Sequence, residues 1–345
     1  MRPNLSFEQP FQQTGAPTFI LINQFGEPSS YVNQWSFGIQ RELTRDMSLE
    51  VTYFGSSGVH LRRLTTYNNA EPSDAPNQNL VRPFPKFGGF QNMNAPSHSS
   101  YHALQARLQH RFSHGFTLLS SFAYGKAIDN GSGIRTTDGD SLTPSNNYNL
   151  ELERGLSTFD FRRRWTNSWL YELPVGKGKS LLRNGPAAAN FVFGGWQFGG
   201  ILTLQDGFPL TAYCSSGAIQ NGGGSCYPDA TGISPNLPRS EQTRTRFFNT
   251  TAFIDRGPVG PRYRYGNSAR DTIIGPGIIN LDASINKKFS IRESKFVEFR
   301  TEFFNLPNHP IWSPPNTTIG NPNYGAITST KIDSRQIQFA LKLVF

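Results

Sequence analysis

Long segments in which apolar and polar residues alternate are the feature that most limits what this chain can fold into. In residues 31–43 the odd positions are mostly apolar or aromatic, and the even positions from 34 to 42 are polar or small. Successive side chains of a β-strand point to opposite faces, so this period of two predicts a strand with one apolar face. Nine segments show this alternation clearly: 31–43, 47–53, 102–112, 116–127, 161–173, 194–205, 278–289, 295–304 and 335–345. Residues 18–25 are a candidate for a tenth strand.

The composition agrees with an all-β protein and excludes several other classes. Charged residues make up 17% of the 345 residues, whereas soluble globular proteins have about 25%. Aromatic residues make up 13%, which disfavours disorder. The longest uninterrupted apolar run, 19–22, has four residues, and a transmembrane helix needs about 20.

The lengths of the strands and of their connections favour a membrane barrel over a soluble sandwich. Most predicted strands have about 9–13 residues, close to the roughly 9–11 of membrane-spanning strands and well above the usual 5–6. Short turns alternate with long connections, as periplasmic turns and extracellular loops do in outer-membrane barrels. By this parity the last strand ends at the periplasmic side. The short turns lie near 44–46, 113–115, 174–179 and 290–294, and the long connections near 56–100, 128–160, 207–277 and 305–334.

We therefore predict an all-β fold, an antiparallel transmembrane β-barrel integral to the outer membrane of a Gram-negative cell. The apolar face should contact lipid and the polar face should line the lumen. His102 and His110 lie on the apolar face, where an interfacial position is favoured over a ligand role. The candidate lumen-lining residues are Gln105, Arg107, Arg164, Gln197, Asp282, Lys288, Glu298, Arg300 and Glu302.

Two cysteines, Cys214 and Cys226, lie in a stretch rich in Gly, Ser and Asn. A metal-binding pair is more often separated by about two to four residues, so a loop disulfide is favoured over two free thiols. A disulfide indicates an oxidising compartment. The first residues do not have the basic and apolar regions of a signal peptide, so an exported protein is expected to have lost its N-terminal part in this chain.

The sequence contains no recognisable catalytic or cofactor motif. HExxH, G-x-S-x-G, Walker and CxxC patterns are all missing, so no enzyme, cofactor or metal site is predicted. Asp138 and Asp140, with Asp129 and Asn130, could bind Ca²⁺, but the EF-hand spacing is missing and solvated turns are favoured. Asp160 is expected to pair with a neighbouring arginine.

A basic stretch lies between residues 239 and 270, where arginine and tyrosine interleave. Nucleic-acid binding uses such residues. On an external loop, however, lipopolysaccharide or an anionic ligand is the better partner, and a merely solvated loop is the simplest interpretation. The candidate residues are Arg244, Arg246, Arg262 and Arg264.

Five segments together resemble the barrel of TonB-dependent, Oar-like outer-membrane transporters. They are YHALQ at 101–105, YGKAIDN at 124–130, YELPVGKGK at 171–179, GWQFGGIL at 195–202 and EFFNLPNHP at 302–310. The end of the chain resembles the signal that the outer-membrane barrel assembly machinery reads, with Ile337, Phe339, Leu341, Leu343 and Phe345 in alternation. The resemblance runs from about residue 30 to the end.

This resemblance implies a barrel of about 22 strands closed by an N-terminal plug, and uptake of a scarce ligand driven by an inner-membrane TonB complex. The chain shows no plug, no TonB-contacting box and fewer than half of those strands. We therefore expect residues 1–345 to be a C-terminal portion of such a barrel, about nine or ten strands with long extracellular loops. TonB would act only through a plug domain missing from this chain. A passive pore and a surface adhesion or structural barrel are the alternatives, and carbohydrate, siderophore and peptide ligands are all open.

Overall fold

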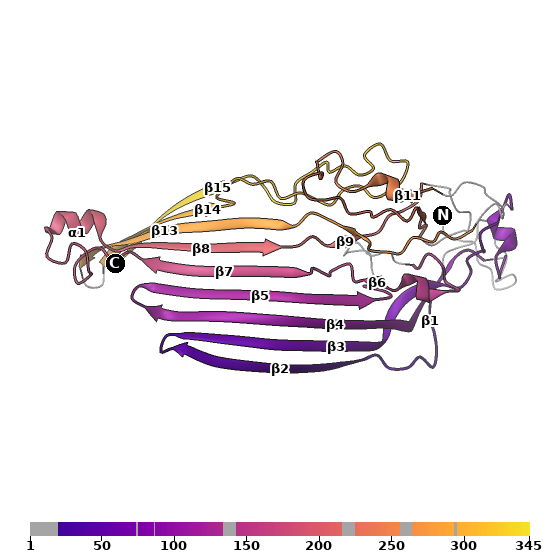
Figure 1. Cartoon of the computed structure of the whole chain (residues 1–345), viewed down its shortest axis with the longest axis horizontal. Coiled ribbons are helices and arrows are strands. Elements are labelled where there is room, and N and C mark those ends of the chain that lie inside the picture. The colour runs from indigo at the N-terminus through magenta and orange to yellow at the C-terminus, as the bar shows by residue number, and fades with distance from the viewer. Residues whose placement is uncertain are drawn as a thin grey trace, which may run out of the picture.

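The alternating segments form one long, curved, antiparallel sheet. The computed structural model describes residues 20–73, 75–85, 87–133, 143–215, 225–255, 264–292 and 295–345. Its largest sheet has 11 strands, and the main path through it contains the nine predicted strands in their predicted order. Figure 1 shows this path, β2 (Tyr31–Thr44), β3 (Met47–Thr66), β4 (Phe90–Ser113), β5 (Phe116–Asp129), β7 (Arg163–Glu172), β8 (Trp196–Gln205), β13 (Ile278–Arg292), β14 (Lys295–Phe304) and β15 (Gln336–Val344).

The direction of the strands agrees with the predicted parity. The hairpin connections β2–β3, β4–β5, β7–β8 and β13–β14 lie at one end of the sheet together with the C-terminus, and the long loops lie at the other end (Figure 1). The β4–β5 turn uses left-handed backbone at His114 (φ 52°) and Gly115 (φ 82°). A Cβ at residue 115 would lie 2.8 Å from the carbonyl oxygen of Glu172, so this turn requires glycine.

Two strands extend far beyond the predicted alternation. The predicted loop 56–100 is wrong at both ends, because β3 has 20 residues and β4 has 24. The extensions stay paired up to Thr66 and Gln91. The period of two disappears there because both faces are covered: the consecutive residues Arg63, Leu64, Thr65 and Thr66, which point to alternate faces, are all buried. A polar strand covered on both sides has no apolar face to show in the sequence.

The candidate tenth strand does not belong to the barrel wall. The part of 18–25 that the structure describes contains β1 (Ile20–Asn23), which pairs in parallel with Phe90–Met93 of β4. It therefore joins the outer extension of β4 instead of following β2 at the edge of the path.

The β7–β8 connection contains a helix in addition to the predicted turn. The short turn at 174–179 is followed by α1 (Ala187–Phe193), so the chain returns to the sheet only at Trp196. The turn at 174–179 is present as predicted, but the connection as a whole is not short, because the Ala-rich segment after the turn forms a helix and has no alternation to reveal it. Among the described residues, no helix is long and apolar enough to cross a membrane.

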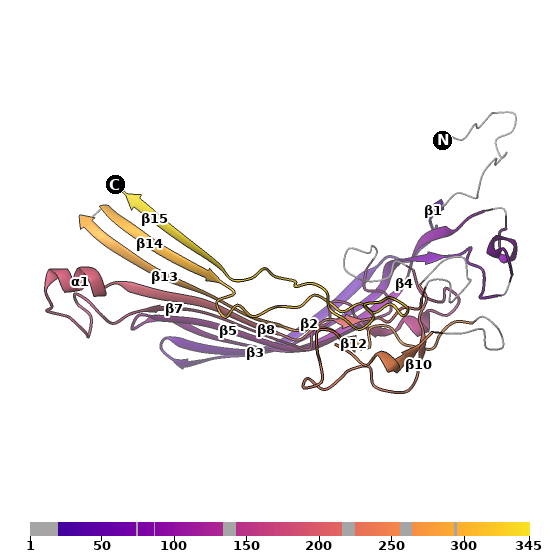
Figure 2. The ribbon, with the colours of Figure 1, turned by 90° about the horizontal axis from the view of Figure 1, so that it is seen from above.

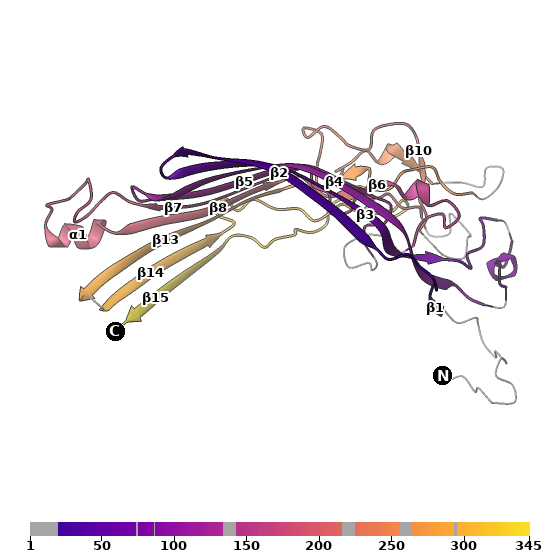
Figure 3. The same cartoon turned by 90° about the horizontal axis from the view of Figure 1, so that it is seen from below.

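The sheet is open at two edges within the residues that the structure describes. It curves strongly, as Figures 2 and 3 show, but β2 and β15 lie at opposite ends of the path and do not pair. Every residue of β2 is exposed, and β15 is exposed except at its last residue. The wall is therefore a partial barrel.

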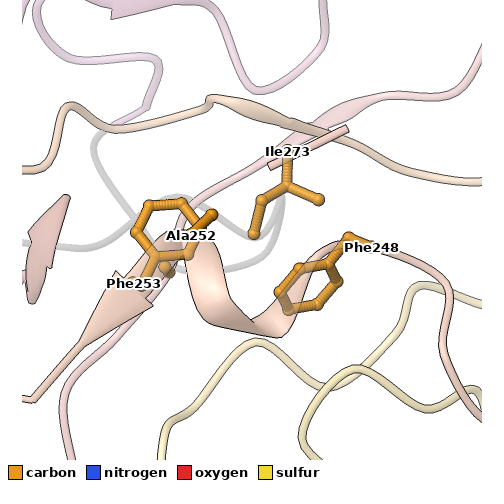
Figure 4. Packing of buried hydrophobic residues seen from close by; sticks show 5 residues of the cluster. Phe248, Ala252, Phe253 and Ile273 are labelled. Carbon is orange, nitrogen blue, oxygen red and sulfur yellow. The ribbon is translucent and has the colours of Figure 1, made fainter. Parts of the chain in front are cut away.

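The long loops form a layer of short elements at the end opposite the hairpins. Its apolar core consists of Ala212, Phe248, Ala252, Phe253 and Ile273, with Leu210, Ile319 and Tyr324 against it (Figure 4). The elements are the 3-10 helices η1 (Gln78–Val81), η3 (Leu150–Glu153) and η4 (Thr250–Ala252), and the strands β6 (Gly155–Leu156), β9 (Pro209–Leu210), β10 (Asp229–Ala230), β11 (Phe253–Ile254) and β12 (Ile273–Ile274).

Candidate functional site

The register of the sheet separates an apolar face from a polar one. Phe37, Tyr53, Leu104 and Tyr124 form one cross-strand row from β2 to β5. Phe37 is 71% exposed and Leu341, at the other edge of the sheet, 74%. A soluble monomer rarely exposes apolar side chains over so large a contiguous surface. This face is suited to contact lipid hydrocarbon.

Aromatic side chains and histidine contact one another on the apolar face. The Nδ1 of His102 lies 2.7 Å from the hydroxyl of Tyr53, and its ring lies 5.9 Å from that of Trp35. The ring of His110 lies 5.5 Å from Phe116. Within the part of the chain that the structure describes, no group of three or more His, Cys, Asp or Glu could hold a metal. These contacts match the amphipathic rings that sit at a membrane interface.

The polar face carries a shallow cavity on β3, β4, β5 and β7. Two adjacent rows of residues that lie opposite one another across the strands line this cavity, which has a volume of about 480 Å³. The first runs from Glu50 through Arg107 to Ser121 and Thr166, and the second from Thr52 through Gln105 to Ala123 and Arg164. Three predicted lumen residues, Gln105, Arg107 and Arg164, thus come together. Two cations beside one carboxylate give this surface a net positive charge.

The other predicted lumen residues form a second polar group on β8 and β13–β15. Lys288, Glu298 and Lys342 are cross-strand neighbours, and Gln197 lies opposite Asn286. Arg300 lies 3.4 Å from a carboxylate oxygen of Glu298 and 3.8 Å from one of Glu302.

Asp282 shares this face but has a structural partner. Its carboxylate accepts a hydrogen bond of 2.8 Å from the backbone N–H of Asn305, so it holds the chain that follows β14.

A buried ionic cluster joins the loops to the outer ends of the strands, and the sequence did not predict it. The cluster consists of Arg63, Asp129, Glu153, Arg270 and Asp271, whose side chains are at most 2% exposed. The guanidinium of Arg270 contacts Asp129 and lies 3.1 Å from Asp271. Arg63 lies 3.8 Å from Glu153. The cluster thus connects β3, β5, η3 and the segment before β12.

Burial controls the proton affinity of the groups around this cluster. It raises the pKa of Glu153, against the lowering effects of Arg63, the N–H of Ser145 and Arg270. The hydroxyl of Tyr227 donates a hydrogen bond of 3.0 Å to Glu153. Burial, and then the charge of Glu153, raise the pKa of Tyr227 well above its ordinary value of 10.0.

The pKa of Tyr227 makes the loop layer sensitive to alkali. Its neutral phenol stabilises the folded layer below pH 10, and this stabilisation is lost as the pH rises through the raised pKa. We expect Tyr227→Phe to be cleaved faster than the parent by an alkali-tolerant protease near neutral pH, because the bond to Glu153 is gone. The difference in cleavage rate between Tyr227→Phe and the parent should narrow above pH 10. Tyr67→Phe, at an exposed tyrosine, serves as the control. A ratio of the cleavage rates of Tyr227→Phe and the parent that stays constant across the pH range would contradict the prediction.

Asp160 has the kind of neighbour that the sequence predicts. Its carboxylate lies 3.8 Å from the guanidinium of Arg162. It also accepts a hydrogen bond of 2.6 Å from the backbone N–H of Ala127. Asp160 therefore connects the segment before β7 to β5.

Among the residues that the structure describes, the candidate binding residues of the loops do not gather into one site. Arg264 forms a bidentate ion pair with Asp229, in which the two guanidinium nitrogens lie 2.9 and 2.5 Å from the two carboxylate oxygens. Arg244 and Arg246 are exposed. Arg262, Asp138 and Asp140 lie outside the described residues. Asp129 belongs to the ionic cluster, and the side chain of Asn130 accepts a hydrogen bond from the N–H of His98.

The structure joins Cys214 and Cys226 in a disulfide, with the Cα atoms 5.4 Å apart. The closed loop spans 12 positions, so the bond should stabilise the layer by about 3 kcal/mol in the chain-entropy account. In urea without reductant, we expect no maleimide labelling of either residue, and labelling of both after reduction. Proteolysis of the layer should also be faster after reduction. Labelling in urea without reductant would contradict this prediction.

The family to which the chain belongs follows from its sequence. The family model of the outer membrane beta barrel domain matches residues 3–338, so the chain belongs to this family. The predicted fold class and the integral outer-membrane location are thereby confirmed. No curated protein matches the sequence.

Solved structures with similar architecture are distant in sequence. The outer membrane transporter YddB from Escherichia coli is 8% identical, with a TM-score of 0.49 over 95% of this chain and 34% of that one. The FrpB iron transporter from Neisseria meningitidis (F3-3 variant) is 10% identical, with a TM-score of 0.41 over 93% and 32%. The siderophore receptor PiuA from Acinetobacter baumannii is 10% identical, with a TM-score of 0.42 over 90% and 28%. The chain spans about a third of the length of these proteins.

Proposed function

We propose that this chain is a C-terminal part of the barrel wall of a TonB-dependent, Oar-like receptor, and that it takes part in energy-coupled uptake of a scarce ligand. The observation that carries the proposal is a curved sheet with one apolar face, one polar face and two open edges. Membership of the outer-membrane barrel family and the five motifs support it. The remaining strands and the plug, through which the TonB complex would act, belong to the rest of the receptor.

The open edges argue against a barrel that works alone in this conformation. In β2 and β15, with 14 and nine residues, about half of the backbone N–H and C=O groups point away from the sheet. Each group without a partner in hydrocarbon costs several kcal/mol. The sum exceeds the usual net stability of about 5–15 kcal/mol, so other strands must meet both edges.

The two surfaces of the wall suit this role. The cavity around Arg107 and Arg164 and the charged rows on β13–β15 would face the lumen and the plug. The loop layer would face the medium and contact lipopolysaccharide. The alternating end of the chain, up to Phe345, would be read by the barrel assembly machinery.

Conductance tests the barrel-wall part of the proposal. The chain is refolded in detergent and added to a planar lipid bilayer. We expect aggregation or unstable conductance, because the edges lack partners. A heat-modifiable monomer with a stable single-channel conductance would overturn the proposal in favour of a passive pore.

Uptake tests energy coupling. Cells with and without the encoding gene are given labelled ferric siderophores, peptides and oligosaccharides, with and without a protonophore. We expect uptake of one class to require both the gene and the proton-motive force, and Arg107→Gln with Arg164→Gln to reduce it relative to the control Arg246→Gln. Uptake that requires the gene but resists the protonophore would indicate a passive pore, and no effect of the gene would favour a structural or adhesive barrel.

A further inference from the structure

The helix α1 contacts the lipid-facing side of the wall, at its periplasmic end. Trp196, Lys287 and Phe299 form one cross-strand row on the apolar face. The indole N–H of Trp196 donates a hydrogen bond of 3.0 Å to the carbonyl of Val192. The ring of Phe191 lies 5.1 Å from that of Phe289, two residues beyond Lys287 on the same face. The last turn of α1 therefore rests against the outside of the barrel wall.

Lys287 is a cation on an otherwise apolar face of β13. The face also contains Leu281, Ala283, Ile285 and Phe289. A charge that faces lipid is costly, yet this one is compensated. Its ammonium donates hydrogen bonds of 2.6 and 2.7 Å to the carbonyls of Phe191 and Val192. It lies 4.9 Å from the ring of Trp196 and 4.7 Å from that of Phe289, and Lys287 is only 3% exposed.

These contacts satisfy groups that a helix end leaves open. The last carbonyls of a helix have no partner within the helix, and the macrodipole places partial negative charge there. Lys287 supplies both donors and positive charge at that end. The side chain is thereby removed from lipid, and α1 is held against β13.

Apolar side chains at the end of α1 stay largely exposed although this turn contacts the wall. Phe191 and Phe193 are each 58% exposed, Val192 is 53% exposed, and Leu181 in the preceding segment is 57% exposed. The basic residues Lys177 and Arg183 of the same connection are also exposed. Apolar and aromatic residues beside cations are the composition of helices that lie in a membrane interface and attract anionic headgroups.

We propose that α1 is a membrane-interfacial helix whose exposed apolar side chains are covered by phospholipid of the periplasmic leaflet. The occupant is lipid because the surface is continuous with the lipid-facing wall and carries cations at its border. Lys287 is the residue that positions the helix there. The inference depends on the outer-membrane location and not on the proposed uptake, so it can fail or hold independently of it.

Photo-crosslinking in living cells tests the occupant. A benzophenone amino acid replaces Phe193 in the full chain, and matched positions carry it at Leu341 on the lipid-facing wall and at Thr245 on an exposed loop. After irradiation, mass spectrometry should find phospholipid adducts at 193 and 341 and none at 245. A crosslink from 193 to a periplasmic protein, or no adduct at 193 while 341 reacts, would overturn the proposal.

The same reporter tests the role of Lys287. Lys287→Met keeps the length of the side chain but removes the charge, and should lower the yield of lipid adduct at 193 several-fold. Lys287→Arg should retain it. The adduct at Leu341 shows whether each variant still folds into the membrane. An unchanged yield at 193 in Lys287→Met, with 341 also unchanged, would overturn the positioning role.

Discussion

Replacing Arg270 with Ala should destabilise the extracellular loop layer by about 3–5 kcal/mol, because breaking a buried ion pair leaves charge without compensation. The Arg270 side chain is 1% exposed and contacts both Asp129 and Asp271. It also donates hydrogen bonds to the hydroxyl of Ser132, at 2.8 Å, and to the carbonyl of Leu156, at 3.2 Å. One guanidinium therefore connects β5, β6 and the segment before β12.

Proteolysis of intact cells measures this effect. Cleavage of transiently open loops follows the free energy of opening, so Arg270→Ala should be cut faster by two orders of magnitude or more. Arg270→Lys keeps the charge but loses the planar guanidinium with its several donors. Its cleavage rate should lie between those of the parent and of Arg270→Ala. Arg246→Ala removes an exposed arginine and should behave like the parent. Equal cleavage of Arg270→Ala and the parent would show that the cluster does not hold the layer.

Replacing Leu341 with Arg should cost about 2–4 kcal/mol if residue 341 lies near the bilayer midplane. Leu341 is 74% exposed and lies opposite Phe299 on the apolar face. Gln338 and Ala340, opposite Glu302 and Arg300, belong to the polar face. Arg at either of these positions faces water and charged neighbours, so it should cost clearly less.

The amount of urea-resistant protein in the outer-membrane fraction compares these variants. Leu341→Arg should lower it strongly, and Gln338→Arg and Ala340→Arg only slightly. The two variants on the polar face are the matched controls, since they add the same side chain to the same strand. Equal losses on both faces would show that the assignment of the faces is wrong.

The wall of the barrel could be predicted from the sequence because its information is local. Each strand of a membrane wall meets lipid on one side and a polar lumen on the other, so its period of two can be read without knowing its neighbours. This is why 278–289 and 295–304 could be assigned to strands, and why Lys288, Glu298 and Arg300 could be placed on one face. The parity of the turns then determined the direction of each strand.

The same local reading misplaced segments in which both faces have similar surroundings. The extensions of β3 and β4 are paired strands beneath loops, where Arg63 and Asn92 are buried, so they do not alternate. β1 pairs in parallel with the part of β4 that extends beyond the barrel wall. The strand edge that β1 uses exists only because of this extension.

The strands of the wall, their order, their two faces and the membrane that those faces require therefore follow from local sequence patterns. Which distant residues meet depends on the three-dimensional fold. Arg270 and Asp129 are separated by 141 positions and Lys287 and Phe191 by 96, and no local pattern relates them. Each contact exists because a buried charge must find a partner, and the fold alone determines which partner is within reach.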